Sequence, residues 1–173
     1  MTTTTFTRED KVALAVQRAR YHLDSFCALM DPHYERAMHT AELCEYLEAV
    51  ERGDITRLAV FMPPRHSKTY HVSERLPAWW MGRHPRAQVI LASYAAELAE
   101  QNSRRARGLL LHPFWPFGTQ LDRMSRAVFR WSTAAGGSVV AAGVGGGITG
   151  FGADLLVIDD PVKGREEADS ETY

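Results

Sequence analysis

Residues 61–72 have the sequence FMPPRHSKTYHV, and this stretch decides the fold that we predict. A phosphate-binding loop has the pattern G-x-x-x-x-G-K-[ST], and Lys68 with Thr69 supplies its last two positions. Ser67 stands where the pattern has its last glycine. Serine is the smallest side chain that still offers a hydrogen bond there, so the change is compatible with a phosphate site. By itself the stretch also fits a proline-rich turn followed by a capped helix.

The segments around this stretch alternate between two periodicities. An apolar run over 57–62, stopped by Pro63 and Pro64, predicts a buried strand, and 68–81 predicts a helix. Further strands are expected at 88–93, 127–131, 138–143 and 154–160, and a helix at 95–111. This order predicts an α/β fold of the P-loop NTPase (ASCE) type, with a largely parallel sheet covered by helices on both faces.

Two helical patterns precede this core. Apolar residues at helical spacing predict one helix over 8–30, which ends at Asp31 and Pro32, and another over 34–50. We therefore expect an N-terminal helical segment over 1–52 and an ATPase core over 53–173.

A second motif, DLLVIDDP over 154–161, ends the predicted sheet. A buried strand that delivers Asp159 to its tip is typical of a Walker B element, in which the first acid holds Mg²⁺ and the next orients the attacking water. Asp160 takes that second position, one methylene shorter than the glutamate often found there. Since ligands bind at the carboxyl ends of parallel strands, we expect Lys68 and Asp159 to meet in space.

Composition narrows the class of protein. The chain has 173 residues, 45% hydrophobic and 24% charged, which favours one globular core over a disordered or fibrous chain. No apolar run reaches the roughly 18 residues of a membrane span, and no signal peptide is present, so we expect a cytoplasmic location without membrane contact. Cys27 and Cys44 favour reduced, buried thiols. His39 and Cys44 could share a metal, but no second pair has zinc-type spacing.

Two further features have competing interpretations. Residues 145–150 satisfy G-x-G-x-x-G, with Glu166 and Asp169 about 20 residues on, but a strand is predicted after them where a dinucleotide site needs a helix. Between Arg75 and Arg130, nine arginines face three acids although the net charge is −1. That basic stretch suits DNA or phosphate binding, and equally a solvated helix face.

Taken together, the loop, the arginine-rich helix, the glycine turn and the acidic strand end resemble the N-terminal packaging ATPase of tailed-phage terminase large subunits. The resemblance covers about residues 38–170 and includes the PPRHSK form of the loop. It implies that ATP and Mg²⁺ bind at the loop, which is Pro64, Arg65, His66, Ser67, Lys68 and Thr69. It also implies that Thr69 and Asp159 hold the metal, and that Asp160 and Arg65 are catalytic.

The family's task, by the same resemblance, is ATP-driven translocation of double-stranded DNA into a procapsid. The expected partners are the DNA, the portal protein, the small terminase subunit and further copies in a homo-oligomeric ring. The coupling motif and the nuclease domain of that family are not found before Tyr173, so the chain is expected to be a fragment or a truncated prophage product. A helicase-type ATPase and a non-catalytic remnant are the alternatives. An arginine finger would come from one of five arginines, which are Arg104, Arg105, Arg107, Arg126 and Arg130.

Overall fold

The computed structural model describes residues 7–125, 127–146, 150 and 152–163. Its helices are α1 (Arg8–Tyr21), α2 (Leu23–Met30), α3 (Met38–Glu51), the π-helix η1 (Tyr70–Arg75), α4 (Leu76–Arg83) and α5 (Ala96–Leu109). Its strands are β1 (Gln88–Ser93), β2 (Arg130–Ser132), β3 (Ser138–Gly143) and β4 (Leu155–Asp159). The predicted strands at 88–93 and 138–143 are confirmed to the residue, and β2 begins three residues later than predicted.

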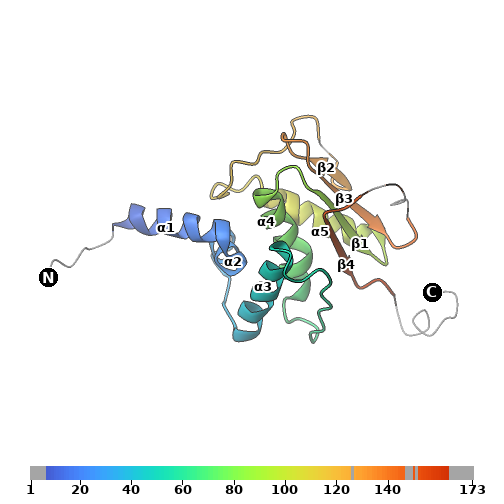
Figure 1. The fold of residues 1–173 in the computed structure, drawn as a ribbon, viewed down its shortest axis with the longest axis horizontal. Coiled ribbons are helices and arrows are strands. Elements are labelled where there is room, and N and C mark those ends of the chain that lie inside the picture. The colour runs from blue at the N-terminus through green and yellow to red at the C-terminus, as the bar shows by residue number, and fades with distance from the viewer. Residues whose placement is uncertain (1–6, 126, 147–149, 151, 164–173) are drawn as a thin grey trace.

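The four strands form one mixed sheet in the order β2-β3-β1-β4 (Figure 1). β1 is parallel to both β3 and β4, whereas β2 runs antiparallel to β3. The predicted α/β class with a mostly parallel sheet is therefore confirmed. Because β1 lies in the middle, its carboxyl end at Ser93 is level with Asp159 of β4 and with Gly143 of β3.

One hydrophobic cluster joins the sheet to the helices. Alternate strand residues, among them Val89, Val139 and Val157, share this cluster with Trp79 of α4 and Phe26 of α2. The same cluster contains Leu43 and Leu47 of α3, so the N-terminal helices pack into the core of the sheet. The division into two regions near residue 52 stays a prediction. No helix in the described part of the chain is long and apolar enough to cross a bilayer.

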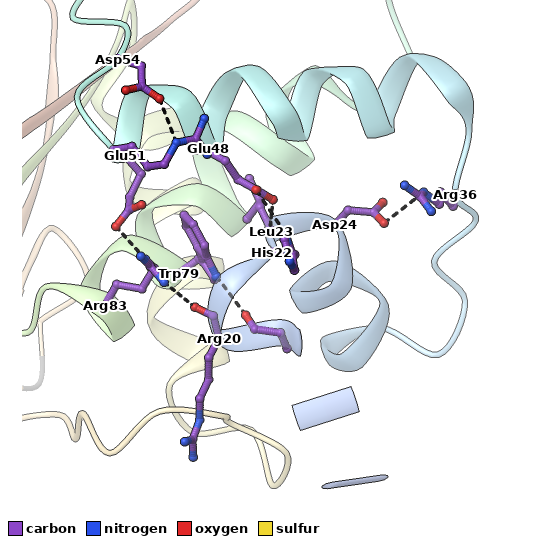
Figure 2. Close-up of polar contacts among 12 residues, drawn as sticks. Arg20, His22, Leu23, Asp24, Arg36, Glu48, Glu51, Asp54, Trp79 and Arg83 are labelled. Carbon is purple, nitrogen blue, oxygen red and sulfur yellow. Dashed lines mark hydrogen bonds and ion pairs between the residues drawn. The ribbon is translucent and has the colours of Figure 1, made fainter. Parts of the chain in front are cut away.

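The prediction of one helix over 8–30 is wrong, because the chain breaks at His22. This residue has extended backbone angles (φ −124°, ψ 121°) and separates α1 from α2. The N–H of Leu23 donates to Glu48 Oε1 at 2.7 Å, so a tertiary contact replaces the helical hydrogen bond (Figure 2). Apolar spacing continues across the break and gives no sign of it in the sequence.

Polar contacts attach the N-terminal helices to the rest of the molecule. Trp79 Nε1 donates to the carbonyl of Ala19 at 3.0 Å, and Arg83 donates to the carbonyl of Arg20 at 2.7 Å (Figure 2). Arg83 also pairs with Glu51 of α3 at 2.6 Å. These contacts link α1 and α3 to α4. They therefore hold the N-terminal helices in place next to the segment that begins with the loop at 63–68.

The prediction of a buried strand over 57–62 is wrong. The segment forms no strand with any described residue, and Phe61 is 94% exposed. A cavity of about 490 Å³ separates this segment from β4, and Leu58, Val60 and Leu156 are among the residues that line it. An extended segment becomes a strand only when a neighbour takes its backbone hydrogen bonds, and here the nearest strand lies across the cavity.

The sheet is covered less completely than predicted. All of β1 but its first residue is buried, whereas β4 alternates between buried and exposed positions. Leu156 and Ile158 are 52% and 54% exposed, so the expectation of two covered faces fails at this strand within the described residues.

The glycine-rich turn does not support a dinucleotide site. The segment that follows it is the strand β4, as predicted, and not a helix. Residues 147–149 and the acids Glu166 and Asp169 lie outside the described residues.

Candidate functional site

The loop at 63–68 has strained backbone at two positions. Arg65 and Ser67 adopt φ values of 65° and 64°, in the left-handed region that favours glycine. Ser67 is the residue that stands where the phosphate-binding pattern has its last glycine, and it keeps the conformation that glycine would have. Non-glycine residues held in this region cluster at functional sites, where the surrounding structure maintains the strain.

Lys68 lies between the two acids that end β4. Its Nζ is 2.6 Å from Asp160 Oδ1 and 3.1 Å from Asp159 Oδ1. The structure thus brings together the loop and the acidic strand end, as the sequence predicted from strand order. Burial acts to lower the pKa of Lys68, but the hydrogen bonds that Lys68 donates to Asp160 and Asp159 outweigh it and raise that pKa above its ordinary value. The amine is therefore charged at neutral pH.

The two acids differ in their surroundings. The Asp159 side chain is only 10% exposed, and its second oxygen, Oδ2, accepts a hydrogen bond from Ser73 Oγ at 2.9 Å. The Asp160 side chain is 66% exposed, and its backbone has a φ of 47°. The N–H of Tyr94 donates to the Asp160 carbonyl at 3.1 Å and so holds this turn next to β1. Asp159 is fixed on both oxygens, whereas Asp160 is open to solvent.

Ser73 is a site residue that sequence reasoning missed. It lies five positions after Lys68, yet both side chains reach Asp159. Residues 70–75 form a π-helix, whose hydrogen bonds run from i to i+5; it begins two residues after Lys68 and contains Ser73. No pattern in the sequence signals it. Single π turns are frequent at functional sites.

The other predicted site residues surround Lys68. Pro64, Arg65 and His66 are exposed, and Thr69 is half-buried at the start of the helix. The ring of His66 hydrogen-bonds the carbonyl of Pro64 at 2.9 Å. A cavity of about 360 Å³ adjoins this side of the loop, between residues 65–67 and the connection from α2 to α3.

The arginines of α5 differ in whether their side chains make polar contacts with the described residues. Arg105 Nη1 is paired with Glu74 of η1, and Arg107 Nη2 donates to the carbonyl of Ser125 at 3.2 Å. Arg104 is exposed and makes no polar side-chain contact with the described residues. Arg130 has a partner of its own, and Arg126 lies outside the described residues. Arg105 and Arg107 thus hold α5 in place.

Residues 60–173 match the family described as "Terminase large subunit, T4likevirus-type, N-terminal". No match was found among curated proteins or among solved structures. The matched region contains the loop, β1, α5 and the acids of β4, and it leaves out α1 to α3. Because the match covers well over half of the chain, this protein belongs to the family of terminase large subunits, of which it represents the N-terminal region.

Proposed function

We propose that this chain is the ATPase motor domain of a phage terminase large subunit, with a P-loop NTPase site at Lys68. ATP hydrolysis at that site drives double-stranded DNA into the procapsid. The observation that carries the proposal is the contact of Lys68 with Asp159 and Asp160, which joins a phosphate-binding lysine to a Walker B acid pair.

The loop binds the phosphates of ATP. Its backbone N–H groups at 65–69 lie at the start of a helix, and the helix dipole favours negative charge at that end. Lys68 Nζ adds a positive point charge. When ATP binds, this amine contacts the phosphates in place of the two carboxylates. Arg65 is exposed on the same loop and places a second positive charge at the reacting phosphate.

The donors near Lys68 fit Mg²⁺. Thr69 offers a hydroxyl and Asp159 a carboxylate, and oxygen ligands of this kind are those that Mg²⁺ prefers. The hydrogen bond from Ser73 orients the Asp159 carboxylate before any ligand arrives. When bound with ATP, Mg²⁺ supplies positive charge that offsets the negative charge on the phosphate oxygens.

Asp160 positions the attacking water. Its carboxylate is largely exposed, so it can accept a hydrogen bond from a water molecule once the phosphates hold Lys68. Attack of that water on the γ-phosphorus breaks the bond to the bridging oxygen and yields ADP and inorganic phosphate. Asp159 does not take this role as well, because its buried carboxylate, which Ser73 orients, is the one that holds Mg²⁺ in this proposal.

The partners follow from the family. A terminase motor acts as a homo-oligomeric ring on the portal protein, receives DNA through the small subunit and works in the cytoplasm of the bacterial host. The excess of arginines in the middle third of the chain provides positive charge for DNA phosphates.

The test is hydrolysis of radiolabelled ATP with protein in excess, so that a slow single turnover is resolved. Wild-type protein with Mg²⁺ should release phosphate, and Asp160→Asn should not. Lys11→Ala, a charge removal on exposed α1, is the matched control and should react like wild type. Equal phosphate release by wild type and Asp160→Asn, or none from wild type even in a ring on portal and DNA, would contradict the proposal.

A further inference from the structure

Three buried side chains with metal-binding atoms meet behind the loop. Cys27 of α2, Cys44 of α3 and His71 of η1 have their ligand atoms within 4.8 Å of one another. They are 0%, 1% and 1% exposed. Both cysteines are free thiols, as the sequence predicted. The sequence raised His39 with Cys44 as a possible metal pair and argued against zinc, whereas the histidine beside both thiols is His71.

The His71 ring is oriented as a metal ligand. Its Nδ1 lies 2.8 Å from the carbonyl of Ser67, which only accepts, so Nδ1 carries the proton and Nε2 keeps a lone pair. The Tyr34 hydroxyl lies 3.3 Å from Nε2, but this hydroxyl donates its own hydrogen to Asp24 at 2.8 Å. The buried Nε2 lone pair therefore has no donor from Tyr34. Histidines that bind metals commonly donate their other nitrogen to a backbone carbonyl in this way.

We propose that Cys27, Cys44 and His71 bind a thiophilic cation, with Zn²⁺ as the best match. Two thiolates and a neutral imidazole balance the charge of a divalent ion, and sulfur with imidazole nitrogen is the donor set that zinc prefers. Neighbouring ligand atoms around tetrahedral zinc are about 3.3–3.8 Å apart, from its usual bond lengths. The cluster needs to contract by about 1 Å to reach this spacing.

Such an ion would connect elements that are far apart in the sequence. The three ligands come from α2, α3 and η1, and the carbonyl of Ser67 ties His71 to the strained part of the loop. Cys27 and Cys44 precede residue 60, where the match to the terminase family begins. The proposed ion is therefore a structural staple that fixes the N-terminal helices to the loop helix, and it does not depend on the proposed ATPase function.

The direct test uses Co²⁺ as a spectroscopic probe in reduced, metal-free wild-type protein. One Co²⁺ per chain should bind, with a thiolate charge-transfer band in the near ultraviolet and the intense visible bands of a tetrahedral ion. Added Zn²⁺ should displace it and remove both. Cys27→Ser and Cys44→Ser should each weaken binding by at least about 100-fold, since even loss of a residue that only supports a ligand costs 10–100-fold. His33→Asn, which removes an exposed histidine outside the cluster, is the control and should bind like wild type.

Several results would overturn the proposal. One is a spectrum with weak octahedral bands and no charge-transfer band. Another is unchanged binding by both cysteine variants. The third is a native mass lower by two hydrogens, which marks a disulfide between Cys27 and Cys44. If the serine variants do not fold, ¹¹³Cd bound to wild-type protein decides the question. Its NMR shift should report two sulfur ligands, and a shift typical of oxygen and nitrogen ligands alone would contradict the assignment.

Discussion

Lys68 holds a charge that two acids neutralise while no phosphate is bound. Lys68 Nζ lies 3.1 Å from Asp159 Oδ1 and 2.6 Å from Asp160 Oδ1, so its positive charge is balanced by two carboxylates of the same site. Phosphate must displace these carboxylates from Lys68, and the same event frees Asp159 and Asp160 for other partners. In the proposed function, binding of ATP is thus coupled through one side chain to readiness for hydrolysis.

We predict that the two acids can be separated by mutation. Asp160→Asn should keep the affinity for Mg-ATP and abolish turnover, because Asp160 is exposed and faces the water. Asp159→Asn should weaken the dependence of ATP binding on Mg²⁺, because the buried carboxylate is the oriented one. Calorimetry with and without Mg²⁺, together with single-turnover hydrolysis, measures both effects. Exchanged behaviour of the two variants would refute this division.

A second residue-scale prediction concerns backbone strain. Ser67→Gly should raise the free energy of unfolding by about 0.5–1 kcal/mol, because glycine adopts a φ of 64° without the steric penalty of a side chain. Glu45→Gly, at an exposed position within α3, is the control and should lower it by about 0.5–1 kcal/mol. Urea denaturation measures both. A loss of stability in Ser67→Gly equal to that of the control would show that Ser67 is not strained.

Among the elements, the helix after the loop has the extent that the sequence predicts. Its helix type differs, because part of it is a π-helix. Its boundaries follow from Pro64 and from apolar spacing, and the structure continues it as helix from 68 to 83. The π turn at 70–75 was not predicted, since no local pattern marks it. One of its residues, Ser73, makes a long-range hydrogen bond to Asp159.

The strand predictions show the same limit. A run of apolar residues such as 88–93 identifies a strand that has neighbours on both sides. The run at 57–62 has equal apolar character, but pairing depends on a partner, and the described residues provide a cavity in its place. Sequence patterns report the tendency of a segment to be extended and carry no information on which neighbour is present.

At the level of α5, we predict that Arg104 is the arginine finger supplied to a neighbouring subunit. Arg105 and Arg107 are held within the chain, which leaves Arg104 as the arginine of this helix that is exposed and makes no polar side-chain contact with the described residues. In a ring assembled on portal and DNA, Arg104→Ala should lower turnover by about 10³-fold or more, since a finger is typically worth 10³–10⁵. Arg105→Ala should mainly lower stability, because it leaves buried Glu74 without that partner. Unchanged turnover by Arg104→Ala would exclude this residue.

For the whole molecule, chain order predicted where the site would form. The expected meeting of Lys68 with Asp159 is observed at the end of β4, although the strand at 57–62 on which the expectation also relied is not formed among the described residues. The packing of α2 and α3 against η1, and with it the cluster of Cys27, Cys44 and His71, did not follow from chain order. Those contacts join residues at least 17 positions apart, and no local pattern records them.

We also predict that the isolated chain binds ATP and hydrolyses it slowly. The described residues place Lys68, Asp159 and Asp160 together, but Arg105 is paired within the chain with Glu74, so the further charge of a finger arginine has to come from a neighbour. Steady-state turnover should rise by orders of magnitude on assembly into a ring with portal and DNA. Fast hydrolysis by the monomer that does not change on assembly would contradict this expectation.

The most direct test of the central claim is calorimetric titration of the chain with Mg-ATP. Lys68→Ala removes a charge-assisted contact worth about 1.5–3 kcal/mol, and it also leaves Asp159 and Asp160 to repel the phosphates. Affinity should therefore fall by roughly tenfold or more, while the control Lys11→Ala keeps the wild-type value. If wild type and Lys68→Ala bind Mg-ATP with equal affinity, the loop at 63–68 is not the nucleotide site.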